Sequence, residues 1–143
     1  MDQFLLWVHP VVQAIALLPG LLALCQGIQR VAMNHFKMRL VFPWKAHVRW
    51  GSVAMLLWIA GAFGFYVTHE VFGETHITGI HAELAVWIIA LCVVGLLSGI
   101  VMDKKKKRRF WLPVIHGFLN GLLIVLVLYE CYTGYLLSAS FLM

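Results

Sequence analysis

Four long apolar segments, separated by short polar connections, dominate the pattern of this chain. They cover approximately residues 4–28, 45–68, 77–102 and 110–137. Each is as long as the roughly 20 residues that a helix needs to cross a bilayer core. Backbone groups in hydrocarbon must be hydrogen-bonded within their own segment, so each segment is predicted to be a helix. We therefore predict an all-α membrane protein, a single domain over residues 1–143 that forms an up-down bundle of four transmembrane helices.

Composition supports lipid as the solvent of these segments. The chain is 62% hydrophobic and 12% charged, whereas a soluble domain is about half apolar and about a quarter charged. The first segment could be mistaken for a signal peptide. It follows Met-Asp-Gln rather than a basic region, and it is too long for a signal peptide's apolar core. We interpret it as a helix of the mature protein.

The basic residues predict the orientation of the bundle. All eleven Lys and Arg residues lie in or beside two connections, at positions 30–49 and 104–109, whereas the connection between them in the chain carries Glu70 and Glu74. By the positive-inside rule, both basic connections are cytoplasmic and both termini face outward. The positive charge is then a sign of topology and of contact with membrane lipid, and it does not indicate nucleic acid.

One histidine lies near the start of each apolar segment: His9, His47, His81 and His116. Consecutive helices of an up-down bundle are antiparallel. His9 and His81 should therefore share the outer level, while His47 and His116 share the inner level, each pair lying on diagonal helices. Two imidazoles facing each other across a bundle suit the axial ligation of a b-type haem. We predict two haem b groups; a histidine relay for metal or protons, and mere packing, are the alternatives.

Small residues recur at a spacing that fits the same hypothesis. Eighteen residues make five helical turns, and a glycine follows three of the four histidines at that spacing. Small residues in membrane helices also simply permit close packing. The residues predicted to pack around haem are Gln13, Gly20, Gly27, Gly51, Gly61, Gly95, Gly99, Asn120 and Gly134.

Polar residues near the predicted haem levels are candidates for supporting roles. Glu83 and Asn120 are predicted to orient His81 and His116. Trp58 and Trp87 lie deeper in their segments, where packing or a place between the haems are the alternatives. The candidates for contact with haem propionates or a quinone are Lys45, Arg49, His76, Glu83 and Glu130.

The short motifs HPVVQ at His9, HVRWG at His47, HAELA at His81 and HGFLN at His116 together resemble the cytochrome b561 superfamily of di-haem membrane proteins. The chain looks like the small bacterial four-helix members, and this resemblance implies a bacterial cytoplasmic membrane with both termini periplasmic. The resemblance implies transmembrane electron transfer. Two flanking helices of the eukaryotic members have no counterpart here, so a quinol is the expected substitute for their electron donor.

The expected function is electron transfer through two bis-histidine haems, linking the quinone pool to a periplasmic redox partner within a larger complex. That partner could be a cytochrome c, including a multihaem one, or other redox subunits. Whether the chain is an enzyme stays open; as one, it would be a quinol-oxidising or quinone-reducing subunit. The alternatives are a haem-containing membrane anchor of a peripheral dehydrogenase and the histidine relay for metal or proton transport.

Overall fold

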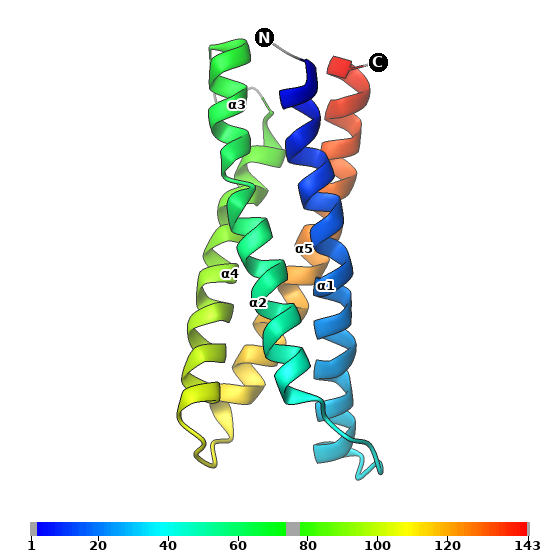
Figure 1. The fold of residues 1–143 in the computed structure, drawn as a ribbon, viewed down its shortest axis with the longest axis vertical. Coiled ribbons are helices and arrows are strands. Elements are labelled where there is room, and N and C mark those ends of the chain that lie inside the picture. The colour runs from blue at the N-terminus through cyan, green and yellow to red at the C-terminus, as the bar shows by residue number, and fades with distance from the viewer. Residues whose placement is uncertain (1–2, 74–77, 143) are drawn as a thin grey trace.

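The computed structural model describes residues 3–73 and 78–142 of the chain, and these residues form helices joined by short connections (Figure 1). In chain order the helices are α1 (Gln3–His35), α2 (Trp44–Ala60), α3 (Phe63–Phe72), α4 (Ile80–Lys104) and α5 (Trp111–Leu142). Among the described residues, four spans are long and apolar enough to cross a membrane: Trp7–His35, Trp44–Val67, Ile80–Lys104 and Trp111–Ser140. The four apolar helices expected from the sequence are therefore present. The candidate residue His76 lies outside the described part of the chain.

The helices extend beyond the apolar segments that predict them. α1 continues to His35 through Arg30 and Asn34, and α5 continues to Leu142. Hydropathy marks only the part of a helix that lipid requires to be apolar, whereas the hydrogen-bond ladder can continue through polar residues at its end. The second span differs more, because it consists of two helices, α2 and α3, with a break at Gly61 and Ala62.

The spans form two antiparallel hairpins. The first hairpin joins α1 to α2 and α3, and the second joins α4 to α5; each hairpin is packed along its length. The hairpins contact one another through α2 with α4 and, less extensively, through α1 with α5. Consequently α1 lies diagonally opposite α4, and α2 lies diagonally opposite α5. The chain termini lie at one end of the bundle, and the two basic connections lie at the other (Figure 1).

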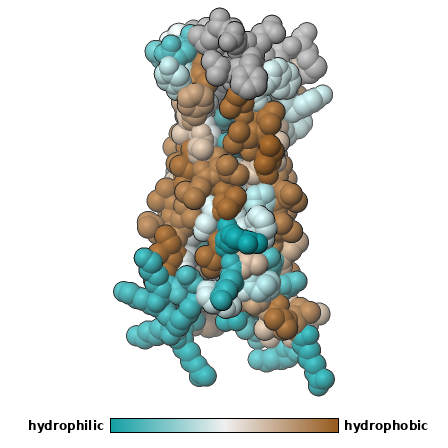
Figure 2. All heavy atoms as spheres, in the orientation of Figure 1, coloured by the Kyte–Doolittle hydropathy of each residue, from teal (hydrophilic) through white to brown (hydrophobic). Residues whose placement is uncertain are grey.

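The core lies in the middle of the bundle and is built from small and aliphatic side chains with one indole. Ala16, Cys92 and Leu123 are almost completely buried, and Trp58 packs with them at 5% exposure. Around this core, large apolar side chains such as Leu18, Leu97 and Val125 are more than half exposed. On the face that Figure 2 shows, apolar side chains form a belt over the middle of the molecule, and hydrophilic side chains gather at the end of the basic connections. An apolar belt of this kind is what a lipid-facing surface requires.

The break between α2 and α3 is held by a residue of α1. The amide of Gly61 donates to Trp58 O, three residues back, and the amide of Ala62 donates to Ile59 O in the same way. A continuous α-helix would pair the Gly61 amide with Leu57 O. That carbonyl instead accepts a hydrogen bond from Gln13 Nε2 at 3.0 Å. The side chain of Gln13 thus satisfies a polar group that the break exposes inside an apolar bundle.

Candidate functional site: two diagonal histidine pairs

The structure brings together the two histidine pairs that the sequence predicts. His9 of α1 faces His81 of α4 near the chain termini, with ring centroids 6.2 Å apart. His47 of α2 faces His116 of α5 near the basic connections, with ring centroids 6.3 Å apart. We call these the terminal-end pair and the basic-end pair. Each pair joins diagonally opposite helices, so both pairs cross the interior of the bundle.

Each imidazole stands against a glycine of the other helix in its own hairpin. A Cβ atom added to Gly27 would lie 3.6 Å from His47 Cε1, and one added to Gly99 would lie 3.7 Å from His116 Cε1. At the terminal-end pair the rings lie closer to the glycines. A Cβ atom added to Gly134 would lie 3.1 Å from His81 Cε1, and one added to Gly64 would lie 2.8 Å from His9 Nδ1.

These contacts give the eighteen-residue spacing a geometric meaning. A glycine eighteen residues after a histidine lies at the opposite end of its helix, where the antiparallel neighbour has its own histidine. Gly64 occupies the place that this spacing would assign to Phe65, because the second span is interrupted just before it. The glycines therefore let the histidine rings lie close to the neighbouring helix.

Three of the four histidines are anchored through Nδ1 to the other helix of their hairpin. His47 Nδ1 lies 3.0 Å from Ala23 O, His116 Nδ1 lies 2.8 Å from Ser98 Oγ, and His81 Nδ1 lies 2.9 Å from Thr133 Oγ1. A carbonyl oxygen can only accept, so His47 donates from Nδ1 and its Nε2 carries the lone pair. Histidines that bind a metal through one nitrogen are commonly held in this way through the other.

The terminal-end pair has a less regular environment. His9 Nδ1 is buried without a hydrogen-bond partner among the described residues. On the opposite side, Glu130 Oε1 lies 3.2 Å from His81 Nδ1. The other carboxylate oxygen, Oε2, is buried without a partner among the described residues. The carboxylate of Glu130 therefore faces the terminal-end pair.

A cleft of about 1840 Å³ surrounds the basic-end pair. It extends from Trp58 and Gly20 in the middle of the bundle, past both rings of the pair, to the basic connections. The cations that line it are Arg30, Lys104, Lys106, Lys107, Arg108 and Arg109. The cleft is larger than the roughly 300–1,000 Å³ of a typical small-molecule site. Added Cβ atoms on Gly117 and Gly121, which also line the cleft, would meet nothing within 4 Å.

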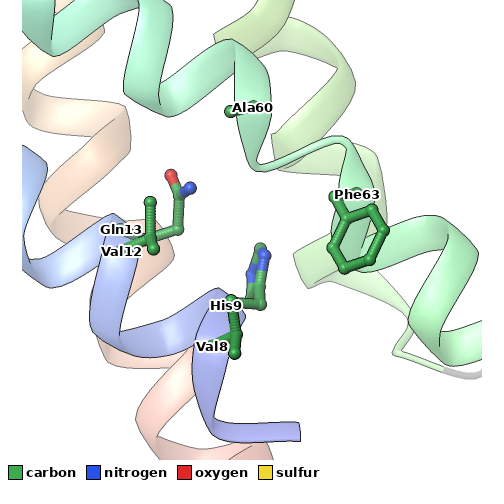
Figure 3. A pocket seen from close by; sticks show the side chains of 6 residues that line it. All are labelled: Val8, His9, Val12, Gln13, Ala60 and Phe63. Carbon is green, nitrogen blue, oxygen red and sulfur yellow. The ribbon is translucent and has the colours of Figure 1, made fainter. Parts of the chain in front are cut away.

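A smaller pocket of about 210 Å³ lies beside His9. Figure 3 shows His9 and Gln13 rising from α1 toward the break of the second span, between Ala60 and Phe63. The lining is mainly aliphatic and aromatic, and His9 and Gln13 supply its polar side chains. The two histidine pairs thus share one arrangement but differ in the space around them.

The structure gives specific contacts for two of the predicted supporting residues. Arg49 lies over the ring of Trp50, with Cζ 4.6 Å from its centroid, and Lys45 lies 5.7 Å from the centroid of Trp44. Neither side chain lines the cleft, whose lining cations belong to α1, to the last residue of α4 and to the connection between α4 and α5. Glu83 is exposed.

Three predicted interior residues have specific packing partners. Asn120 donates to His116 O in its own helix at 2.7 Å, rather than to the imidazole. Gly20 lies against the indole of Trp58, and Gly51 lies against Ala23. Gly95 lies against Asn120 and the thioether of Met55. Trp58 is buried, whereas Trp87 is 66% exposed and belongs to the apolar surface.

The sequence reasoning missed Ser98 and Thr133, although a local signal was present. Each hydroxyl residue immediately precedes one of the glycines that seat a histidine, in the dipeptides Ser98-Gly99 and Thr133-Gly134. In each dipeptide the glycine leaves space for an imidazole ring, and the hydroxyl beside it hydrogen-bonds to Nδ1 of the same ring. Arg30 was also missed as a cation of the cleft, because its position beyond the apolar segment suggested only a loop residue.

Fold and site together define a class: a four-span helical protein whose spans are long and apolar enough for a membrane, with two histidine pairs across its interior. In comparisons with known proteins, no family model, curated protein or solved structure matches this chain.

Proposed function

We propose that this protein is a membrane cytochrome that transfers electrons across a membrane through two b-type haems, each held by one diagonal histidine pair. The observation that carries the proposal is the separation of the facing imidazoles, 6.2 and 6.3 Å between centroids. A transition-metal bond to imidazole nitrogen is about 2 Å long, and the ring centroid lies about 1 Å behind that nitrogen, so two axial imidazoles on one iron have centroids about 6 Å apart.

The number of ligands favours haem over a bare metal ion. Within the described ranges there is no group of three or more His, Cys, Asp or Glu side chains that could hold a metal ion. A tetrahedral zinc site takes three or four protein ligands. Haem needs only one or two axial ligands from the protein, because the porphyrin supplies the other four nitrogens. Two imidazoles on opposite sides of a bundle therefore match haem.

The surroundings of the basic-end pair also fit a macrocycle with carboxylate side chains. His47 and His116 lie in a cleft with an apolar interior, and the cations of its mouth are suited to carboxylates. The surroundings of the terminal-end pair are more compact, with an aliphatic and aromatic pocket beside His9. His9 and His81 would hold the second haem, and the helices would exclude water from both.

When bound, haem iron supplies one-electron redox chemistry, and its potential depends on axial ligands, hydrogen bonds and burial. The chain contributes the imidazoles, their hydrogen-bond partners and the apolar enclosure. We further propose the bacterial cytoplasmic membrane as its location, with both termini periplasmic, because every Lys and Arg lies at one end of the bundle. Quinone would be exchanged from the bilayer, and a periplasmic redox partner would dock near the chain termini.

The test is the haem b content of the purified protein, measured as its pyridine haemochrome, together with the visible spectrum of the dithionite-reduced form. We expect two haem b per chain and b-type bands. Each of His9→Ala, His81→Ala, His47→Ala and His116→Ala should lower the content to one. His69→Ala is the matched control, since His69 is exposed beside Glu70 and belongs to neither pair.

A colourless protein would refute the proposal and leave a structural or relay role for the histidines. A content of one haem, lost in only two of the four variants, would refute a transmembrane path of two haems. Full turnover of a partner dehydrogenase after His47→Ala and His116→Ala would show that the chain acts as an anchor.

A further inference from the structure

Two hydroxyl side chains of the second hairpin each reach the histidine of the opposite helix. Ser98 of α4 lies 2.8 Å from Nδ1 of His116 on α5, and Thr133 of α5 lies 2.9 Å from Nδ1 of His81 on α4. Thr133 is 6% exposed, the lowest value for a polar side chain in the described ranges. The two contacts are reciprocal: each helix supplies one imidazole and one hydroxyl.

The other hydrogen bonds of the hydroxyls indicate where the protons lie. Ser98 Oγ is also 2.8 Å from Val94 O and 3.0 Å from Gly95 O, and Thr133 Oγ1 is 3.0 Å from Glu130 O. A hydroxyl has one proton and a carbonyl has none. If the hydroxyl proton points to the backbone carbonyl, the imidazole must donate from Nδ1, and every contact is then between a donor and an acceptor. The opposite assignment would place the hydroxyl lone pairs against the carbonyl oxygen.

Glu130 also lies at His81, with its Oε1 atom 3.2 Å from Nδ1, so a second side-chain oxygen stands beside this nitrogen. In the first hairpin, His47 donates from Nδ1 to Ala23 O, so a backbone carbonyl does there what Ser98 does for His116. In the basic-end pair, His47 is therefore held by a backbone carbonyl, whereas His116 is held by the Ser98 side chain, which a substitution can remove.

We infer that Ser98 and Thr133 are positioning residues that hold His116 and His81 as Nδ1–H tautomers, with the lone pair on Nε2 available for haem iron. This inference rests on the proposed function for its purpose, but the tautomers themselves do not require haem. The neighbouring glycines differ in how closely they meet the rings: a Cβ atom added to Gly134 would lie 3.1 Å from His81 Cε1, which is tighter than ordinary contact, whereas one added to Gly99 would lie at an ordinary 3.7 Å from His116 Cε1.

The first experiment reads the tautomers directly. The full chain with ¹⁵N-labelled histidine, produced without haem in lipid nanodiscs, is studied by NMR, with the signals of His116 and His81 assigned through His116→Ala and His81→Ala. Neutral Nδ1–H and Nε2–H imidazoles differ in their nitrogen shifts. We expect both residues as Nδ1–H. Either residue found as Nε2–H in the wild-type chain overturns its part of the inference.

The second experiment measures haem retention in the loaded protein, as the transfer of haem to an excess of an apoprotein acceptor. Loss of a partner that orients a metal-bound histidine typically lowers metal affinity roughly 10–100-fold. Ser98→Ala should weaken one haem by a factor in this range, and Thr133→Val should weaken the other. Ser98→Thr and Thr133→Ser keep the hydroxyl and should restore retention. Redox titration should show a shifted midpoint potential for the affected haem alone.

Ser140→Ala is the matched control, because Ser140 Oγ donates to Leu137 O at 2.8 Å, as Ser98 does to its own helix, and has no hydrogen bond to a histidine of residues 3–73 and 78–142. Unchanged retention, potential and tautomer in Ser98→Ala and Thr133→Val would overturn the inference. Equal loss of both haems in each variant would also overturn it, as the mark of general destabilisation. If the wild type bound no haem, the proposed function would fall, and the NMR result alone would decide the assignment of the tautomers.

Discussion

Gln13 donates a hydrogen bond at 3.0 Å from α1 to Leu57 O, at the point where the second span is interrupted. The residue thus joins the first two helices of the chain and caps a local defect in one of them. An unpaired carbonyl in an apolar interior costs about 1–3 kcal/mol. The contact also places Gln13 one helical turn from His9, on the wall of the same pocket (Figure 3).

Replacing Gln13 with Ala should therefore destabilise the bundle. We expect the free energy of unfolding to fall by about 1–3 kcal/mol, because Leu57 O loses its side-chain partner. Thermal unfolding in detergent, followed by circular dichroism, measures the change. Gln29→Ala on the same helix is the control and should change stability by less than about 0.5 kcal/mol. Equal effects of the two substitutions would contradict the capping role of Gln13.

The glycines of the first hairpin should differ in their tolerance of a methyl group. An added Cβ on Gly20 would lie 2.5 Å from the indole of Trp58, a rigid and buried ring, whereas one on Gly51 would lie 3.7 Å from Ala23 Cβ. We expect Gly20→Ala to lower the free energy of unfolding by about 1–3 kcal/mol through overpacking. Gly51→Ala should be neutral or stabilising, since Ala favours a helix by about 1 kcal/mol. Thermal unfolding in detergent compares the two variants. A Gly20→Ala variant as stable as the wild type would contradict the close packing of Gly20 against Trp58.

The glycines that seat the histidines should affect the two pairs unequally. Gly64→Ala and Gly134→Ala place a methyl group 2.8 and 3.1 Å from the rings of His9 and His81, whereas Gly27→Ala and Gly99→Ala place it at ordinary contact distances of 3.6 and 3.7 Å. The first two should therefore lower haem content toward one per chain by displacing a ligand of the terminal-end pair. The second two should retain two haems, as read from the pyridine haemochrome. The opposite ranking would show that the glycines do not serve the histidine rings.

Orientation is testable without haem. The two basic connections lie at one end of the bundle, and the chain termini lie at the other. If the positive-inside rule applies, alkaline phosphatase fused after residue 143 should be active, and a green fluorescent protein inserted after Lys105 should fluoresce. The reverse pattern of activities would place the basic end outside. Replacing residues 104–109 with neutral residues should weaken the orientation and yield a mixture of both patterns.

The existence and number of the spans were predictable because lipid imposes the same demand on every helix that crosses it. Apolar runs of sufficient length, with cations confined to two connections, require no knowledge of partners in space. The pairing of His9 with His81 and of His47 with His116 also followed, because it depends only on alternating direction and on a square of four helices. The ends of α1 and α5 did not follow, since hydropathy reports where lipid is and not where hydrogen bonding stops.

The break in the second span was not predicted, although Gly61 and Gly64 lie at its edges. Glycine in a membrane helix also serves close packing. The hydrogen bond that satisfies Leu57 O at this break comes from Gln13 on another helix. The same limit applies to the side-chain contacts of Lys45, Arg49 and Asn120, because the direction of each side chain depends on neighbours that the sequence does not specify.

The sequence by itself determined that this chain forms four apolar helices, that one histidine stands near the beginning of each, and that the cations share one end. Those properties depend on lipid solvation and helical period, which act on each segment separately. Only the tertiary structure decided that Ser98, Thr133 and the Ala23 carbonyl hold three of the rings, and that the cleft surrounds one pair. Hydrogen bonds between helices depend on the relative rotation and depth of two packed surfaces, and no single segment encodes these.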